Sequence, residues 1–132
     1  MAHIKSINKT ILIGRLGSDP ELRHTKSGTP VCNLSIATSK SFKDKDSDEW
    51  REVTQWHRVV LWRGLAEFAA ERLSKGAAVY IEGELRYRSW EDENGNTRKT
   101  AEIYATTCNL LADGRSTSAE GAPDADEEEI PF

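Results

Sequence analysis

Residues 51–62 read Arg51-Glu52-Val53-Thr54-Gln55-Trp56-His57-Arg58-Val59-Val60-Leu61-Trp62, and they are the most informative segment of the chain's body. Successive side chains of a β-strand point to opposite faces, so every second residue shares a face. The odd positions from Val53 to Leu61 are mainly aliphatic, whereas the even positions carry two tryptophans with Arg58 between them. The stretch therefore predicts a strand with one aliphatic face and one aromatic, basic face.

Two strands are predicted before this one. Residues 10–14 are a short apolar, β-branched run that stops at the turn composition of residues 17–20. Residues 31–39 alternate apolar and polar side chains, which predicts a half-buried strand. The charged residues 40–49 contain Phe42 as their single apolar side chain and predict an extended loop or a hairpin tip.

A short amphipathic helix and two more strands are predicted after it. Four apolar residues between positions 65 and 73 recur at helical spacing, and Gly76 is expected to be the C′ glycine that ends this helix. Residues 77–90 and 100–111 are expected to form the last two strands, joined by a tight Asn-Gly hairpin at residues 94–95.

The predicted order of elements is therefore βββαββ. Five strands with a helix between the third and the fourth match the OB-fold, a five-stranded Greek-key barrel whose face and loops often bind oligonucleotides. We expect an all-β protein with one helix, in which residues 1–112 form a single OB-fold domain.

The end of the chain differs from this domain in composition. Residues 113–123 are rich in Gly, Ser, Thr and Ala without periodicity and predict a flexible linker, and residues 124–132 predict an acidic tail. Residues 1–112 hold 17 Lys and Arg against 15 Asp and Glu, whereas residues 113–132 hold 1 against 7. A mildly basic body and a strongly acidic tail attract each other. We interpret the tail as a peptide ligand for partner proteins, formed by Asp126, Glu127, Glu128, Glu129, Ile130, Pro131 and Phe132. The alternative is a solvated acidic end without a partner.

A second aromatic, basic face is predicted on the strand of residues 77–90. Aromatic rings stack on bases of any type and arginines hold the phosphates beside them, so together they bind single strands with little sequence preference. Duplex bases cannot be stacked in this way. The candidate DNA-binding residues are Phe42, Trp56, Trp62, Trp90, Arg58, Arg86, Arg88 and Lys45. Trp50 is interpreted as a structural or loop residue, and His57 as a buried or interface residue.

No cofactor, metal site or catalytic group is expected. Cys32 and Cys108 lack the spacing of a disulfide framework or a zinc site, and we interpret them as two thiols in strands of a reducing cytosol. No phosphate-binding loop and no nucleophile motif is present. The N-terminus lacks the apolar run of a signal peptide, and no apolar stretch is long enough to span a bilayer. We therefore expect a cytoplasmic binding protein without membrane association or enzymatic activity.

Three alternatives use the same residues differently. The barrel can be a scaffold for an adaptor whose tail is the sole functional part, or part of a nuclease, although no metal-ligand cluster supports the nuclease. The fold can also take single-stranded RNA or an oligosaccharide, because stacking alone does not separate these ligands from DNA.

Several segments in register carry a family resemblance. They are Asn-Lys-Thr-Ile-Leu-Ile-Gly-Arg-Leu-Gly at residues 8–17, Asp-Pro-Glu at 19–21, Ile-Ala-Thr-Ser at 36–39, Trp-His-Arg-Val-Val-Leu at 56–61, Lys-Gly at 75–76, Val-Tyr-Ile-Glu-Gly at 79–83 and Ile-Pro-Phe at 130–132. By these segments the chain closely resembles the bacterial single-stranded DNA-binding proteins.

That resemblance implies an OB-fold that assembles as a homotetramer, wraps single-stranded DNA during DNA replication, recombination and repair, and recruits other enzymes through its tail. It also implies that Phe42, Trp56, Trp62 and Trp90 occupy base-stacking positions, with Phe42 in place of Trp and Trp62 in place of Phe relative to the best-known enterobacterial pattern. The linker is short for the family, which leaves a chromosomal, plasmid or phage origin open.

Overall fold

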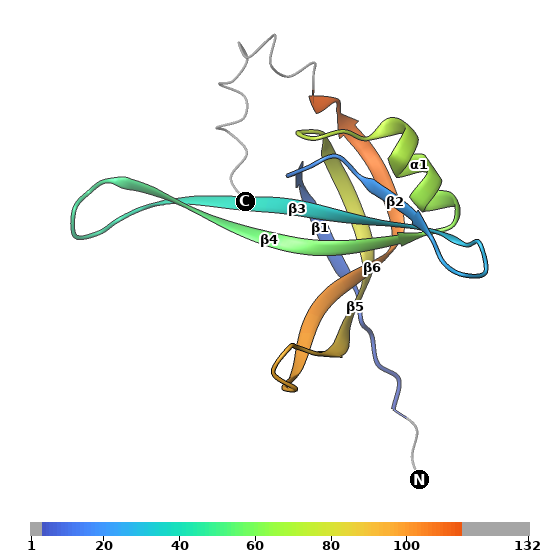
Figure 1. Ribbon diagram of the computed structural model, residues 1–132. Coiled ribbons are helices and arrows are strands. Elements are labelled where there is room, and N and C mark those ends of the chain that lie inside the picture. The colour runs from blue at the N-terminus through green and yellow to red at the C-terminus, as the bar shows by residue number, and fades with distance from the viewer. Residues whose placement is uncertain (1–3, 115–132) are drawn as a thin grey trace.

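The computed structural model describes residues 4–114, which form six strands and one helix. The elements are β1 (Thr10–Leu16), β2 (Glu21–His24), β3 (Pro30–Lys43), β4 (Trp50–Trp62), α1 (Gly64–Arg72), β5 (Ala78–Glu91) and β6 (Thr97–Ala112) (Figure 1). The tail predicted at residues 124–132 and the linker beyond Gly114 lie outside the described residues.

The strands are hydrogen-bonded in the order β1-β5-β6-β4-β3-β2. An additional antiparallel pairing of β1 with β3, at Arg15↔Ala37 and Leu16↔Ile36, closes the five long strands into a barrel. The helix lies between β4 and β5 in the chain, as expected for the predicted order. The prediction of an all-β, five-stranded OB-fold barrel with one helix is confirmed.

The core fills the barrel with the alternating apolar residues that the sequence indicated. Ile36, Val59, Leu61, Val79 and Ile81 are fully buried, and α1 packs against the same cluster through two alanines in its middle, Ala66 and Ala69. On β4, the face of the odd-numbered residues is fully buried only at Val59 and Leu61. Val53 is exposed because it lies farther out, where β4 has left the barrel.

One strand was not predicted. The four residues of β2 are all exposed and pair with the outer edge of β3, from Glu21↔Asn33 to His24↔Pro30. A strand that buries neither face shows no hydrophobic alternation, so its pairing with β3 is set by tertiary structure rather than by local pattern.

The strands β3 and β4 continue beyond the barrel as a long two-stranded arm, which projects to the left in Figure 1. The ladder runs without a break from Val31↔Trp62 to Lys43↔Trp50, so only residues 44–49 form the tip. The loop predicted at residues 40–49 is therefore shorter than expected, because charged side chains are compatible with a strand exposed on both faces. At the tip, Asp44 accepts hydrogen bonds from the Asp46 backbone (3.0 Å) and from Arg51 Nε (2.8 Å), and these bonds lower the pKa of its carboxyl.

The helix ends earlier than predicted. It stops at Arg72, and Leu73 is already extended. Gly76, the expected C′ glycine, lies instead in a turn in which the Ala77 N–H donates to the Ser74 carbonyl at 3.0 Å and Gly76 itself has φ 89°. That positive φ explains the glycine, and the assignment to the helix C-terminus is wrong. The hairpin at Asn94-Gly95 is confirmed, with Gly95 at φ 83° in the turn between β5 and β6.

Both cysteines are buried free thiols in strands, Cys32 in β3 and Cys108 in β6. Within residues 4–114, no helix is long and apolar enough to cross a bilayer. The same residues hold no group of three or more His, Cys, Asp or Glu side chains arranged for a metal ion.

We expect alkaline pH to destabilise this fold through Cys108. Burial raises the pKa of its thiol to about 11 from an ordinary value of 9.0, so the folded state disfavours the thiolate. The unfolded chain releases this proton at lower pH, so the contribution is present below pH 9.0 and is lost as the pH rises towards about 11. In urea unfolding at about pH 8 and about pH 10.5, the midpoint should fall more for wild type than for Cys108→Val. Equal falls in both proteins would contradict this effect.

Candidate nucleic-acid interface

A groove of about 860 Å³ opens beside the base of the arm. Its walls come from the turn after β1, from β2, from the neighbouring strands β3 and β4, and from Arg88 on β5. It brings together three residues proposed from the sequence, namely Trp56, Arg58 and Arg88. Arg23 on β2 also lines the groove, and sequence analysis missed it because β2 itself was not predicted.

Trp56 is the aromatic side chain of this groove. It is 60% exposed, and it lies on the face of β4 that it shares with Arg58. One edge of its ring contacts Gly17, where a Cβ atom would overlap the indole. Gly17 is held to β3 by a hydrogen bond from its N–H to the Ser35 carbonyl at 2.9 Å. The glycine therefore leaves room for an indole whose remaining surface is open to a base.

Arg88 is held by a carboxylate that sequence analysis did not single out. Glu102 on β6 is only 4% exposed, and Arg88 Nε donates to its Oε2 at 3.2 Å. The β5–β6 register places Arg86 opposite Glu102, on the same face as Arg88. The Arg88 side chain nevertheless stays half-exposed. Glu102 therefore orients the guanidinium, and the solvent side of this group is accessible to a phosphate.

Arg86 has partners of its own outside the groove. Its Nε donates to Glu84 Oε1 at 3.0 Å, and its guanidinium carbon lies 4.5 Å from the centre of the Tyr104 ring. This cation–π contact fixes the side chain next to Arg88 along the surface of β5. Arg86 therefore extends the basic surface beyond the groove but is not part of its wall.

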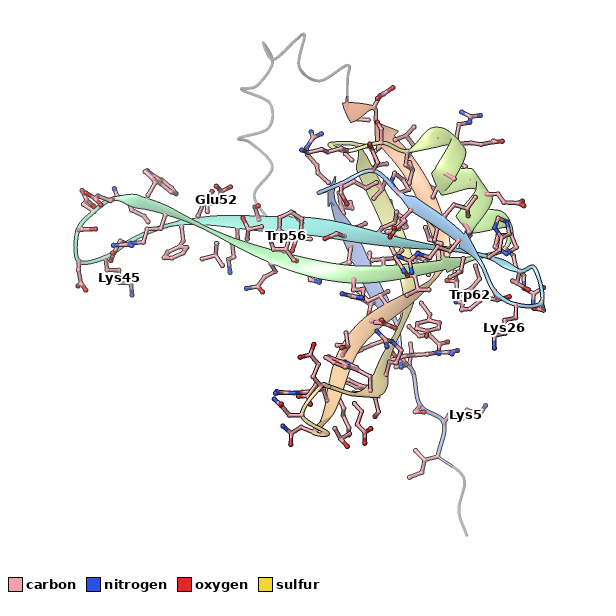
Figure 2. The ribbon with its side chains drawn as sticks, in the orientation of Figure 1. Lys5, Lys26, Lys45, Glu52, Trp56 and Trp62 are labelled. Carbon is pink, nitrogen blue, oxygen red and sulfur yellow. The ribbon has the colours of Figure 1, made fainter. Side chains whose placement is uncertain are left out.

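Trp62 and Trp90 are exposed but lie apart from the groove. Trp62 ends β4 at the barrel and pairs in register with Val31. Trp90 lies near the end of the β5–β6 hairpin, and its Nε1 donates to Thr100 Oγ1 at 2.8 Å, which fixes the orientation of the ring. Figure 2 shows Trp56 on the arm and Trp62 at the barrel end of the same strand. The structure does not gather the three tryptophans at one place.

Phe42 and Lys45 belong to the arm. Phe42 is part of β3 and pairs with Arg51, so it lies on the face opposite to Trp56, beside Val53 and Gln55. Because the register of the hairpin fixes its side, Phe42 does not share a face with Trp56, and its role in base stacking stays a prediction. Lys45 is exposed in the loop at the end of the arm (Figure 2).

His57 is half-buried and borders the groove. A hydrogen bond of 2.9 Å joins its Nε2 to Thr38 Oγ1 on the neighbouring strand. The histidine therefore has a partner within the described structure.

Comparisons with known proteins bear on this geometry. A family model described as the single-strand binding protein family matches residues 7–111. Among curated proteins, the single-stranded DNA-binding protein 1 of Xylella fastidiosa (strain 9a5c) is 49% identical over 106 residues, which are 80% of this chain and 78% of that protein.

Two solved structures have the same fold. A Plasmodium falciparum SSB complex with ssDNA superposes with a TM-score of 0.72 at 30% identity, covering 84% of this chain and 98% of that one. A deletion mutant of the single-stranded DNA binding protein from Thermus aquaticus gives a TM-score of 0.69 at 34% identity, covering 83% of this chain and 52% of that one. With the family model matching most of its length, the chain belongs to the single-strand binding protein family.

Proposed function

We propose that this protein binds single-stranded DNA without sequence preference, by stacking bases on exposed tryptophans and holding phosphates with arginines. The proposal rests on the groove in which Trp56 lies beside Arg58 and Arg88. An indole stacks on any base, and two guanidinium groups next to it match the phosphates on either side of that base. The family is one of binding proteins, and the protein is not an enzyme.

The choice of a DNA single strand draws on the relatives. The Plasmodium falciparum structure is described as a complex with ssDNA, and the Xylella fastidiosa protein is named for single-stranded DNA. Base stacking and phosphate contacts do not select deoxyribose, so RNA and oligosaccharides are the competing ligands within the same fold.

A direct test follows the binding of a labelled dT oligonucleotide by fluorescence anisotropy at low salt. We expect saturable binding that an unlabelled single strand of any sequence removes and that an equal amount of duplex does not. An RNA oligomer or an oligosaccharide that competes better than DNA would overturn the choice of ligand. Shortening of the labelled strand in the presence of Mg²⁺ would indicate a nuclease instead.

The cellular part of the proposal follows from the family. We infer that the protein acts as a homotetramer in the cytoplasm, where it protects single strands during DNA replication, recombination and repair. We also propose that residues 124–132 recruit partner proteins of these processes, with Ile130-Pro131-Phe132 as the apolar part offered to a partner. Without residues 124–132, the barrel should still bind DNA but should not retain those partners.

Deleting residues 124–132 should strengthen DNA binding severalfold at low salt. The deleted segment carries five Asp and Glu and no Lys or Arg, so it competes with phosphates for Arg58, Arg86 and Arg88. The gain should be greatest at about 0.01 M salt, where the Debye length is about 30 Å, and should vanish at about 1 M, where it is about 3 Å. Replacing only Ile130, Pro131 and Phe132 by alanine keeps the charge and should leave DNA affinity unchanged. Unchanged affinity of the deletion variant at low salt would count against the competition.

A further inference from the structure

The outer end of the arm carries a tryptophan that the groove does not use. Trp50 is the first residue of β4 and is 71% exposed, the largest exposed fraction among the four tryptophans of the chain. It belongs to β4 and not to the loop, and it is not a core residue. A single exposed apolar side chain is ordinary on a protein surface, so the case for a function of Trp50 rests on its position relative to Trp56.

Trp50 lies on the same face of the arm as Trp56. Even-numbered residues of β4 share a face, and six residues at about 3.3 Å each separate the two rings by roughly 20 Å along the strand. The register pairs Trp50 with Lys43 and Trp56 with Ala37, so odd-numbered residues of β3 lie on this face as well. The hydrogen bond of 3.1 Å between the hydroxyl groups of Ser39 and Thr54, midway along, joins side chains of that same face.

The surface between the two rings is narrow and polar. From Trp56 outward it is formed by Thr54 and Ser39 and then by Glu52 and Ser41, before Trp50 and Lys43. Figure 2 shows Glu52 and Trp56 on the same side of the arm. Small hydroxyl side chains leave room for a nucleic-acid strand to run along this face. The twist of the two-stranded ladder rotates the face gradually between Trp56 and the tip.

Charge at the tip does not by itself attract a polyanion. Lys43 Nζ lies 3.2 Å from Asp48 Oδ1, and Arg51 is bound to Asp44 on the other face, so these two cations already have carboxylate partners. Lys45 is exposed in the loop, but Asp44, Asp46, Asp48 and Glu49 surround it in the sequence. Any contact of Trp50 with a nucleic acid therefore depends mainly on its ring. This separates Trp50 from Trp56, which has Arg58 and Arg88 beside it in the groove.

We propose that Trp50 is a distal stacking platform for single-stranded DNA, at the outer end of the arm face that begins at Trp56. The inference rests on the proposed function, because it extends the path of the same ligand. Strands long enough to run from the groove along the arm place a base on Trp50, and shorter strands occupy the groove alone.

A variant with Trp50 as its single tryptophan tests this contact. The substitutions Trp56→Phe, Trp62→Phe and Trp90→Phe keep aromatic rings at the other positions and leave Trp50 as the only source of tryptophan emission. We expect a dT oligomer of about 16 nucleotides to quench this emission with saturation, and one of about 4 nucleotides to leave it unchanged although it binds.

Each other outcome has a distinct meaning. If anisotropy of a labelled oligomer reports binding of the longer strand and the emission of Trp50 does not change, the platform is wrong while the proposed function stands. If wild type itself binds no oligomer, both fail. Emission that depends on protein concentration and not on DNA would assign Trp50 to an interface between copies of this chain, and would also overturn the proposal.

Affinity measurements on Trp50→Ala give an independent readout. We expect at least about fivefold weaker binding of the longer oligomer, no change for the shorter one, and an unchanged dependence on salt. Trp50→Phe should restore most of the loss. Tyr87→Ala is the matched control, since Tyr87 is a similarly exposed aromatic residue on the face of β5 opposite to Trp90. An equal loss for both oligomers, or none for either, would contradict the proposal.

Discussion

Replacing Trp56 by alanine should weaken binding of single-stranded DNA by about 5- to 150-fold, whatever the base sequence. The range corresponds to about 1 to 3 kcal/mol for one stacked base. Because the ring is 60% exposed and lies against the surface residue Gly17, its removal opens no cavity in the core. Trp90→Ala should have an effect of the same size, since its ring is held in place by Thr100. Anisotropy titrations with oligomers of several sequences measure both losses.

Two controls keep this result specific. Tyr87→Ala removes an exposed aromatic ring from the opposite face of the β5–β6 hairpin and should leave affinity unchanged. Thermal unfolding of each variant should match wild type, because the substituted rings lie on the surface. If Trp56→Ala and Trp90→Ala both bind as wild type does, bases do not stack on this surface.

Binding should also weaken steeply as salt increases. Each phosphate neutralised on a single strand contributes about −0.7 to the slope of log affinity against log salt. A protein that contacts about six phosphates would therefore lose about 300-fold in affinity between about 50 and 200 mM salt. Arg58→Ala and Arg88→Ala should each make the slope shallower by about 0.7, because both guanidinium groups line the groove.

The matched control is Arg72→Ala, which removes the same charge from the last turn of α1, outside the groove. Its slope should equal that of wild type. A slope near zero for wild type, or equal changes for Arg72→Ala and Arg58→Ala, is incompatible with phosphate contacts in the groove.

The barrel followed from the sequence because its core strands bury one face and expose the other. Cys32, Leu34 and Ile36 on β3, and Val79 and Ile81 on β5, alternate with exposed or half-buried residues, and this alternation alone predicts both strands. On β4 the alternation fails at Val60, which is buried between Val59 and Leu61. The same pattern is absent from β2, whose residues are all exposed, and from the arm, where Val53 is exposed although it shares the parity of Val59.

From the sequence, the neighbours of a candidate binding residue could be predicted only within its own strand. Parity places Trp56 beside Arg58, but the position of Phe42 depends on the β3–β4 register, which is set by the length of the loop at residues 44–49. Two features of the site involve strands far apart in the chain. Trp56 and Arg88 line the same groove, and the buried Glu102 forms a hydrogen bond with Arg88. Such contacts arise from barrel closure, and no local pattern reports them.

A single titration of intrinsic tryptophan fluorescence with poly-dT tests the central claim most directly. The exposed tryptophans, Trp56 among them beside the arginines of the groove, are the proposed stacking surface, so base stacking must change their emission. Base stacking on these rings predicts strong, saturable quenching at low salt that is reversed as salt is added. Emission that stays constant while a labelled oligomer is shown to bind, or constant emission because nothing binds, would contradict it.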